Sequence, residues 1–263
     1  MNFITLGAVD LALASVLVII NGGLSLALGL GLERQLLIAA TRMVIQLSLM
    51  GLVLKALFAL VSPFWTAVAA LIMVLFAGHE ASARQRKRFS GWWTYGLGTS
   101  SMMAAGLIVT VLALTTQIKP DPWYDPRYAL PLLGMILGNT MNGVALGLNA
   151  LITGVVREKS AVEARLALGH DIGTAMSGVV REAVRTGLIP IINAMAAAGI
   201  VSLPGMMTGQ ILAGIPPVEA VKYQILIMFL IAGGTGLGLL SAVYGGVYRL
   251  SDNRQRLRLD RLI

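Results

Sequence analysis

The chain has 263 residues, of which 57% are hydrophobic and only 12% are charged, and its mean hydropathy is +0.81. A soluble core cannot bury this much apolar surface, so the composition places the chain in a lipid bilayer. The formal charge of +8 does not predict a nucleic-acid partner, because the basic residues cluster beside apolar runs, where they set membrane orientation. With no cysteine, the sequence excludes a disulfide framework, a thiolate metal site and a cysteine nucleophile.

Apolar runs long enough to cross a hydrocarbon core of about 30 Å recur along the whole chain. They predict an all-α, polytopic membrane helix bundle that folds as one domain over residues 1–263. The segment at 204–217 is too short to cross and too apolar for a plain loop, which indicates a re-entrant or interfacial position. About seven transmembrane helices are expected, at residues 4–32, 36–59, 64–78, 94–116, 129–152, 188–203 and 224–248.

The Lys and Arg residues predict which side of the membrane each loop faces. With the N-terminus outside and the C-terminus in the cytoplasm, fifteen of the twenty basic residues are cytoplasmic, four are outside and one lies within a span. Cytoplasmic loops carry the Lys and Arg excess, so this N-out, C-in orientation is favoured. We expect a multi-pass protein of the cell membrane, which in a bacterium is the inner membrane. One of the basic clusters behind this prediction is Arg84, Arg86, Lys87 and Arg88.

Two ionisable side chains are expected within the first two spans. Asp10 lies about two turns into the first span and Arg42 about two turns into the second. An ionised group at the bilayer centre costs roughly 2.5 to 3.5 kcal/mol on insertion, so such groups are shielded or functional. Arg42 can extend to the interface or cap carbonyl groups there, or it can belong to an inner gate. We therefore keep Arg42 as a pathway candidate.

The fifth span carries asparagines at helical spacing. Asn139 precedes Asn142 by three positions and Asn149 follows Asn142 by seven, so one broad face presents all three amides. This row either lines a translocation pathway or hydrogen-bonds to neighbouring helices. Asn193, at the start of the sixth span, is a candidate partner of the row. The pathway candidates are thus Asn139, Asn142, Asn193 and Arg42.

Glycines and prolines mark close packing and possible bending. Gly134 with Gly138, and Gly143 with Gly147, are each four apart, a spacing that lets helices approach closely in lipid. Two prolines bracket the short sixth span and can break it, which a membrane tolerates only against protein or a water-filled cavity. The hinge candidates are Pro190 and Pro204.

The longest polar interval of the chain runs from Arg157 to Pro190. In the predicted orientation it forms a cytoplasmic loop at about 153–187, and its spacing is helical. Glu163, Ala164 and Gly169 fall at the offsets of E-A-A-x-x-x-G, a pattern by which many permeases of ATP-driven transporters contact their ATPase. The sequence therefore predicts a helical docking loop for a soluble partner. Its contact candidates are Glu163, Gly169, Arg181, Glu182 and Arg185.

No enzymatic signature occurs in the chain. His79 and His170 are the only histidines, and neither belongs to a zinc-binding spacing such as H-x-x-x-H. The phosphate loop G-x-x-x-x-G-K-[ST] and the serine hydrolase pattern are absent from the sequence. We expect that the chain is not an enzyme and holds no cofactor of its own. The sequence does not assign any metal ligands.

Three strings carry a family resemblance: ALPLLGMILGNTMNGVALGLN, REAVRTGLIPIINAM and SLPGMMTGQILAGIPPVEAVKYQILIMFLIA. Together they resemble the FetB family of iron-export permeases, which are the membrane partners of a separately encoded ATPase, FetA. Plant aluminium-tolerance permeases are similar at a greater distance. The resemblance implies the membrane subunit of an ABC transporter that exports iron or another metal. It also implies two copies per complex, contact with membrane lipids, and a FetA-like subunit that holds the ATP.

One local departure concerns the docking pattern. Importer-type permeases continue with an apolar residue and L-P about ten positions after the glycine. Here Arg181 and Glu182 occupy that place, and Ile189-Pro190 follows later. The contact residues are therefore less firmly assigned than the loop.

Two other functions fit the same residues. An ion-driven secondary carrier would use Asp10 as its coupling acid and would transport without a nucleotide-binding partner. A membrane scaffold that does not transport would recruit a soluble protein through its basic loop, and its asparagines would be dispensable.

Overall fold

The computed structural model describes residues 7–85, 88–252 and 254–263, so Arg86 and Lys87 of the predicted basic cluster lie outside the described residues. Over these ranges the named elements are all helices, and six of them are long and apolar enough to cross a membrane. The prediction of an all-α, polytopic membrane protein is confirmed. The chain divides into two compact units, one up to Leu60 and one from Val61 onward. A single domain over the whole chain stays a prediction.

The first unit is a helical hairpin of α1 (Ala8–Ala27) and α2 (Glu33–Leu60). Ser25 joins the two helices, because its Oγ donates to Glu33 Oε2 at 2.9 Å and accepts the Leu32 N–H at 2.9 Å. Most other side chains of the hairpin are exposed and apolar. This composition suits helices that lipid or other spans surround.

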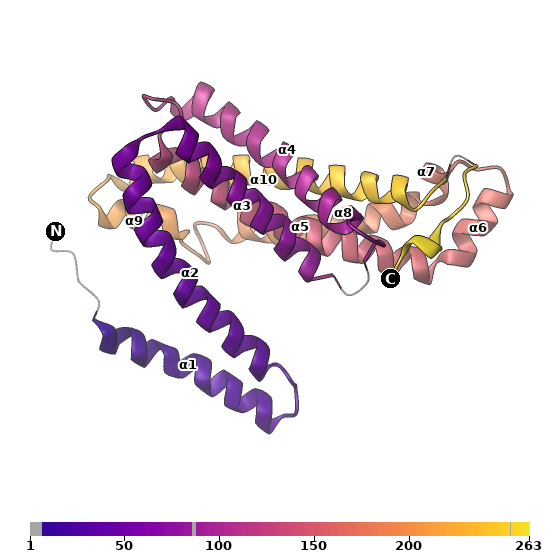
Figure 1. Cartoon of the computed structure of the whole chain (residues 1–263), viewed down its shortest axis with the longest axis horizontal. Coiled ribbons are helices and arrows are strands. Elements are labelled where there is room, and N and C mark those ends of the chain that lie inside the picture. Colours follow the sequence, from indigo (N-terminus) through magenta and orange to yellow (C-terminus); the bar gives the residue numbers. More distant parts are fainter. Residues whose placement is uncertain (1–6, 86–87, 253) are drawn as a thin grey trace. The chain divides into compact units, whose positions relative to one another are not determined.

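The second unit is built around α5, which packs against four other long helices (Figure 1). At about 1.5 Å per residue, α5 and α10 each extend roughly 50 Å, longer than the hydrocarbon core. The elements are α3 (Pro63–Ala83), α4 (Trp93–Leu112), the π-helix η1 (Ala113–Ile118), α5 (Pro126–Arg157), α6 (Lys159–Ala167), α7 (Ile172–Ala175), α8 (Ser177–Ala197), α9 (Gly205–Leu212), α10 (Pro217–Arg249) and the 3-10 helix η2 (Leu259–Arg261).

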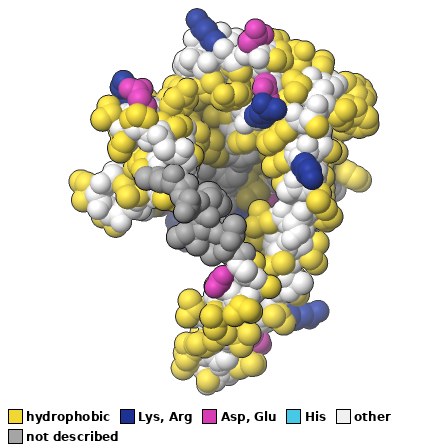
Figure 2. Space-filling model, turned by 90° about the vertical axis from the view of Figure 1, so that its left-hand side faces the viewer, with side chains coloured by type: hydrophobic (Ala, Val, Ile, Leu, Met, Phe, Trp, Pro, Cys, Tyr) yellow, Lys and Arg dark blue, Asp and Glu magenta, His cyan; other side chains and the backbone are white. Residues whose placement is uncertain are grey.

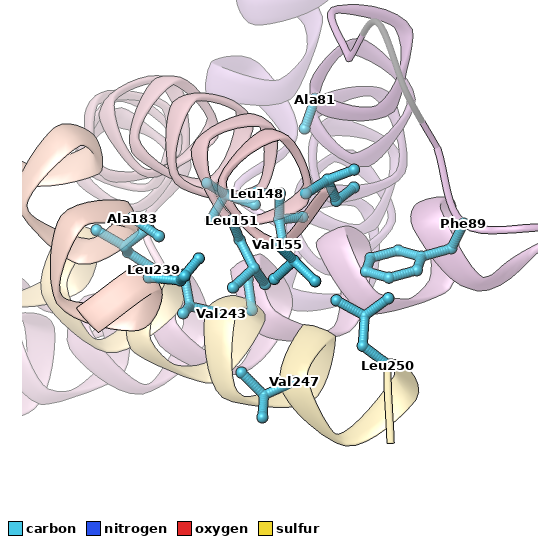
Figure 3. Close-up of a cluster of buried hydrophobic side chains, with 14 of the residues drawn as sticks. Ala81, Phe89, Leu148, Leu151, Val155, Ala183, Leu239, Val243, Val247 and Leu250 are labelled. Atoms are coloured by element: carbon cyan, nitrogen blue, oxygen red, sulfur yellow. The ribbon is translucent and has the colours of Figure 1, made fainter. Parts of the chain in front are cut away.

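The main apolar core lies where α5 and α10 meet (Figure 3). Leu148, Leu151 and Val155 of α5 face Leu239 and Val243 of α10, and all five are fully buried. Further along α10 the core continues to Val247 and Leu250, and the loop before α4 adds Phe89. Side chains from separate spans thus close one continuous core at this end of the unit.

Glycines bring α8 against α5 at van der Waals distance. A Cβ added at Gly187 would lie 2.7 Å from the Gly143 carbonyl oxygen and 2.6 Å from Leu239 Cδ2. A Cβ added at Gly147 would overlap Leu239 Cδ1 and lie 3.3 Å from the Ala183 carbonyl oxygen. The predicted close approach at Gly143 and Gly147 is confirmed. Of the other predicted pair, Gly138 faces open space.

The sixth expected span differs most from its prediction. Residues 188–203 do not form a separate helix: α8 begins at Ser177, continues through Pro190 and ends at Ala197. Its first half carries Arg181, Glu182 and Arg185, so it is not among the six helices that qualify as spans. The prediction places these charged residues in a loop. They instead form the first turns of α8, because the other face of these turns packs against α5.

The segment at 204–217 contains a short helix, as its length suggested. Pro204 is the N-cap of α9, and Pro217 begins α10. The eight residues of α9 span only about 12 Å, too little to cross a bilayer.

The close packing at Gly187 predicts a position-specific loss of stability. We expect Gly187→Ala to destabilise the bundle by about 1 to 3 kcal/mol, because the added methyl group meets a backbone carbonyl that cannot turn away. Gly178→Ala, on the same helix with open space around its Cα, is the matched control and should be neutral or slightly stabilising. Thermal unfolding in detergent measures both. Equal melting temperatures for the two variants would contradict the close contact between α8 and α5 at Gly187.

Candidate docking platform and translocation face

Basic residues gather at one end of the second unit, where α5 and α10 end and α8 begins. The opposite end, around η1 and α9, carries only three of the unit's fifteen described basic residues: Lys119, Arg127 and Lys222. Seen from the left-hand side of Figure 1, the surface is mostly apolar with scattered charges (Figure 2). This one-sided distribution is what the orientation prediction requires, while the side of the membrane stays a prediction.

The loop at the basic end is shorter than predicted, because α5 continues to Arg157 and α8 begins at Ser177. We call residues 158–176, which carry α6 and α7, the docking loop. Val162, Ala175 and Met176 are almost fully buried in the main core. The loop is therefore a packed extension of the bundle and not a free tether.

Polar contacts fix the shape of the docking loop. Arg165 Nη1 donates to the Ala175 carbonyl at 3.1 Å, which joins α6 to α7. Asp171 caps α7, accepting the Thr174 hydroxyl at 2.6 Å and the Thr174 N–H at 3.0 Å. These bonds to Thr174, the side-chain bond foremost, lower the pKa of Asp171 from its ordinary value. The carboxylate thus stays ionised as a cap at neutral pH.

The outer surface of α6 is exposed. Glu163 lies on this surface and pairs with Lys159 at 3.7 Å, one helical turn away. Gly169 has φ +91°, a left-handed conformation that lets the chain reverse after α6 and holds Leu168 outward. The Leu168 side chain is 79% exposed. This apolar side chain therefore lies uncovered in the turn that follows the charged surface of α6.

The C-terminal tail, described at residues 250–252 and 254–263, ties this end together, which the sequence prediction missed. The backbone groups of Ile263 and Arg88 bond to each other at 2.8 and 3.1 Å. Arg261 Nη1 donates to the Arg249 carbonyl at 2.7 Å. Gln255 Oε1 accepts the Ile172 N–H at 2.8 Å, at the start of α7. The tail therefore connects the end of α10, the loop before α4 and the docking loop.

A signal for this tail was present in the sequence. Leu257, Leu259 and Leu262 alternate with arginines and pack against the main core. The apolar residues between those arginines indicate a folded segment, which a prediction based on orientation charges alone does not include.

The remaining docking candidates lie on α8. Arg181, Glu182 and Arg185 are exposed in its first two to three turns. Glu182 lines a groove of about 220 Å³ between α5 and α8, together with Asn149 and Arg157. The structure thus separates the candidates into a loop group, Glu163 and Gly169, and a group on the wall of the bundle.

The amide row of α5 lies on the face that other helices cover least. Asn142 is exposed, while Asn139 and Asn149 are half-buried. Asn142 Oδ1 accepts Arg84 Nη1 at 2.7 Å, so α3 sends a charged side chain to the row. Sequence reasoning had used Arg84 only as an orientation charge.

Asn193 does not contribute a hydrogen bond to the row among the described residues. Asn139 Nδ2 instead donates to the Met135 carbonyl of its own helix at 2.9 Å. The register at Gly143 and Gly187 brings Asn193 to a similar level in the bundle, where it is exposed on α8.

The charges of the first unit differ in their surroundings. Asp10 lies in the first turn of α1, since this helix begins at Ala8, and Asp10 Oδ2 accepts the Gly7 N–H at 2.8 Å. The expected position two turns into a span is therefore wrong, and the carboxylate serves as a helix cap that the helix dipole favours. Arg42 is exposed in the middle of α2.

The hinge candidates are placed differently from each other. Pro190 lies inside α8, which continues past it for seven residues, so the predicted break at this proline is wrong. Pro204 does follow a break, because residues 198–204 connect α8 to α9.

The described residues contain no group of three or more acidic or histidine side chains that could hold a metal ion. His79 and His170 are both exposed. The polar side chains at membrane depth are mainly neutral amides and threonines, which bind hard cations more weakly than carboxylates do.

The family model described as "Uncharacterised protein family (UPF0014)" matches residues 8–250. The chain belongs to this family. It is 39% identical to the UPF0014 membrane protein slr1647 of Synechocystis sp. over 87% of each chain. It is 33% identical to the "Probable iron export permease protein FetB" of Escherichia coli, over 96% of this chain and 95% of that protein. No solved structure matches.

The resemblance also extends to plants, as expected. "Protein ALUMINUM SENSITIVE 3" of Arabidopsis thaliana is 32% identical over 90% of this chain and 85% of its own. The resemblance to FetB-type permeases is thus confirmed over nearly the whole length of this UPF0014 member, and the chain is a multi-pass membrane protein.

The bond between tail and docking loop gives a local prediction. Gln255→Ala should speed amide exchange at Ile172 roughly two- to tenfold, because a single hydrogen bond contributes about 0.5 to 1.5 kcal/mol net. Arg254→Ala, at the neighbouring position, should leave that exchange unchanged. Hydrogen exchange with mass spectrometry over residues 166–178 measures the effect. Unaltered exchange in Gln255→Ala would show that the tail does not hold α7.

Proposed function

We propose that this chain is the membrane-spanning permease subunit of an ATP-driven exporter, with iron or another metal as its substrate. It forms the translocation pathway and couples to a separate, FetA-like ATP-binding subunit through the predicted 157–187 region. Two copies form the pore. The FetB relative, named a probable iron export permease, supports the export function and the metal.

The observation that carries the proposal is the helical hairpin of α5 and α8. It has the amide row along one helix and the docking loop at its end, and the glycine contacts lock the two helices together. A movement at the loop is therefore transmitted to the amide row without bending of either helix. This is the connection that a subunit driven by an external ATPase requires.

The docking surface consists of α6 and the turn after it. Glu163 offers charge, and Leu168 offers an apolar side chain that a partner can bury. Burial of one leucine gains about 1.5 to 3 kcal/mol, and the surrounding charges set the partner's orientation. Arg181 and Arg185 on α8 extend this surface along the wall of the bundle.

The pathway follows the exposed face of α5. Exposed amides on a spanning helix are unfavourable against hydrocarbon, so this face calls for water or protein beside it. A second copy placed face to face would enclose the row between two α5 helices. Neutral amide oxygens bind a metal or its chelate weakly, which suits passage and not storage.

Bending is best placed at the break before Pro204. The continuous α8 moves with α5, whereas residues 198–204 join it to α9 through a short non-helical connection. ATP binding would move the paired hairpins, and this connection would absorb the change.

The docking residues can be tested by charge reversal. Glu163→Lys combined with Arg181→Glu should abolish ATPase stimulation by the permease or co-purification with the ATP-binding subunit, because two complementary charges become repulsive. Lys222→Glu, at the opposite end of the unit, is the matched control and should retain both. Normal partner binding in the double variant would remove the docking proposal.

The pathway residues can be tested with docking kept intact. Asn139→Leu combined with Asn142→Leu should lower metal export from proteoliposomes at least tenfold while co-purification persists, because the pathway loses its polar lining. Ser241→Ala, an exposed hydroxyl change on α10, should transport normally. Unreduced export would contradict the pathway and favour a scaffold. Transport by the permease alone in an ion gradient would instead favour a secondary carrier.

A further inference from the structure

A cavity beside the C-terminal tail has no part in the function proposed above. Its volume is about 590 Å³, within the range of small-molecule sites. The end of α10, Trp93 at the start of α4, Ile172 of the docking loop and residues of the tail form its walls. Its charged lining is Arg249, Arg254, Arg256, Arg261 and Asp252.

The charge in this cavity is unbalanced. Asp252 is the only acidic residue of the lining, and its carboxylate accepts Arg256 Nε at 2.8 Å and the Arg256 N–H at 2.9 Å. The backbone bond from Arg256, foremost among its contacts, lowers the pKa of Asp252 to about 2, so it neutralises one arginine at neutral pH. Three guanidinium charges remain. Arg258 adds none to this excess, because it pairs with Asp260 at 2.7 Å.

Two of these arginines are held in place by contacts that leave their charge intact. Arg261 donates to the carbonyl groups of Arg249 and Ser251, which caps the end of α10. Arg249 lies over the Trp93 ring at 4.7 Å, and its Nε is buried without a hydrogen-bond partner among the described residues. The aromatic ring fixes this guanidinium beside the cavity without neutralising its charge.

We propose that this cavity binds a phosphate group. Guanidinium groups suit phosphate because their N–H donors form paired hydrogen bonds to its oxygens. The position favours the headgroup of an anionic phospholipid, since α10 is a candidate span that ends at Arg249 and the adjacent Tyr248 and Trp93 are exposed. Aromatic side chains with basic residues at the end of a span mark the membrane interface.

The experiment uses the purified full chain in a neutral detergent. It is titrated with short-chain phosphatidylglycerol, with phosphatidylcholine of the same chain length, and with inorganic phosphate, and binding is followed by tryptophan fluorescence. Saturable binding of phosphatidylglycerol well above that of phosphatidylcholine supports a lipid headgroup site. Saturable binding of inorganic phosphate alone supports a phosphate site filled from solution.

Variants then assign the binding to the cavity. Arg254→Gln should lower the affinity for the ligand about tenfold, because one charged contact is lost. Arg249→Lys retains the charge but removes the paired donors, so it should weaken binding as well. This variant replaces Arg254→Gln in the test if Arg254→Gln lowers the melting temperature of the unliganded chain. Arg157→Gln, at the same end but outside the cavity, is the matched control. No saturable binding, or equal loss in Arg157→Gln and Arg254→Gln, overturns the proposal.

Discussion

The contact of α8 with α5 across bare backbone is the constraint on which the rest of this structure depends. Lipid supplies no hydrophobic force that pushes spans together, so helices associate in it through close packing. Gly143 and Gly187 permit that packing, and Leu239 of α10 fills the space beside them. Because α8 is held here, its first turns lie against α5, and their charged side chains are exposed on the outer side. The docking loop and the tail are then assembled on an end that is already fixed.

Sequence reasoning reached the fold class because the signals for spans are long and redundant. It also located the close approach at Gly143 and Gly147 and the three amides that share the least covered face of α5. It misjudged α8, because three charges within five residues resemble a loop when only polarity is counted. Whether such residues are helical depends on what packs against their other face, and that is a tertiary contact.

The parts of the site that sequence could not supply are contacts between segments far apart in the chain. Nothing local to Arg84 indicates that it reaches Asn142, and nothing local to Gln255 indicates that it bonds to Ile172. The position of Asp10 was wrong for a simpler reason: the apolar run begins before the helix does, and a carboxylate one turn from its start is a favoured cap. The proposed coupling between the docking loop and the amide row includes these long-range contacts, which no local pattern predicts.

The fixed position of Leu168 has a consequence for how the proposed partner would bind. The turn at Gly169 holds this side chain outward, and the rest of the docking loop is packed too firmly to withdraw it. The side chain thus has one orientation before any partner is bound. A partner of the kind proposed would therefore meet this leucine in a fixed position, so that binding orders fewer side chains and costs less conformational entropy.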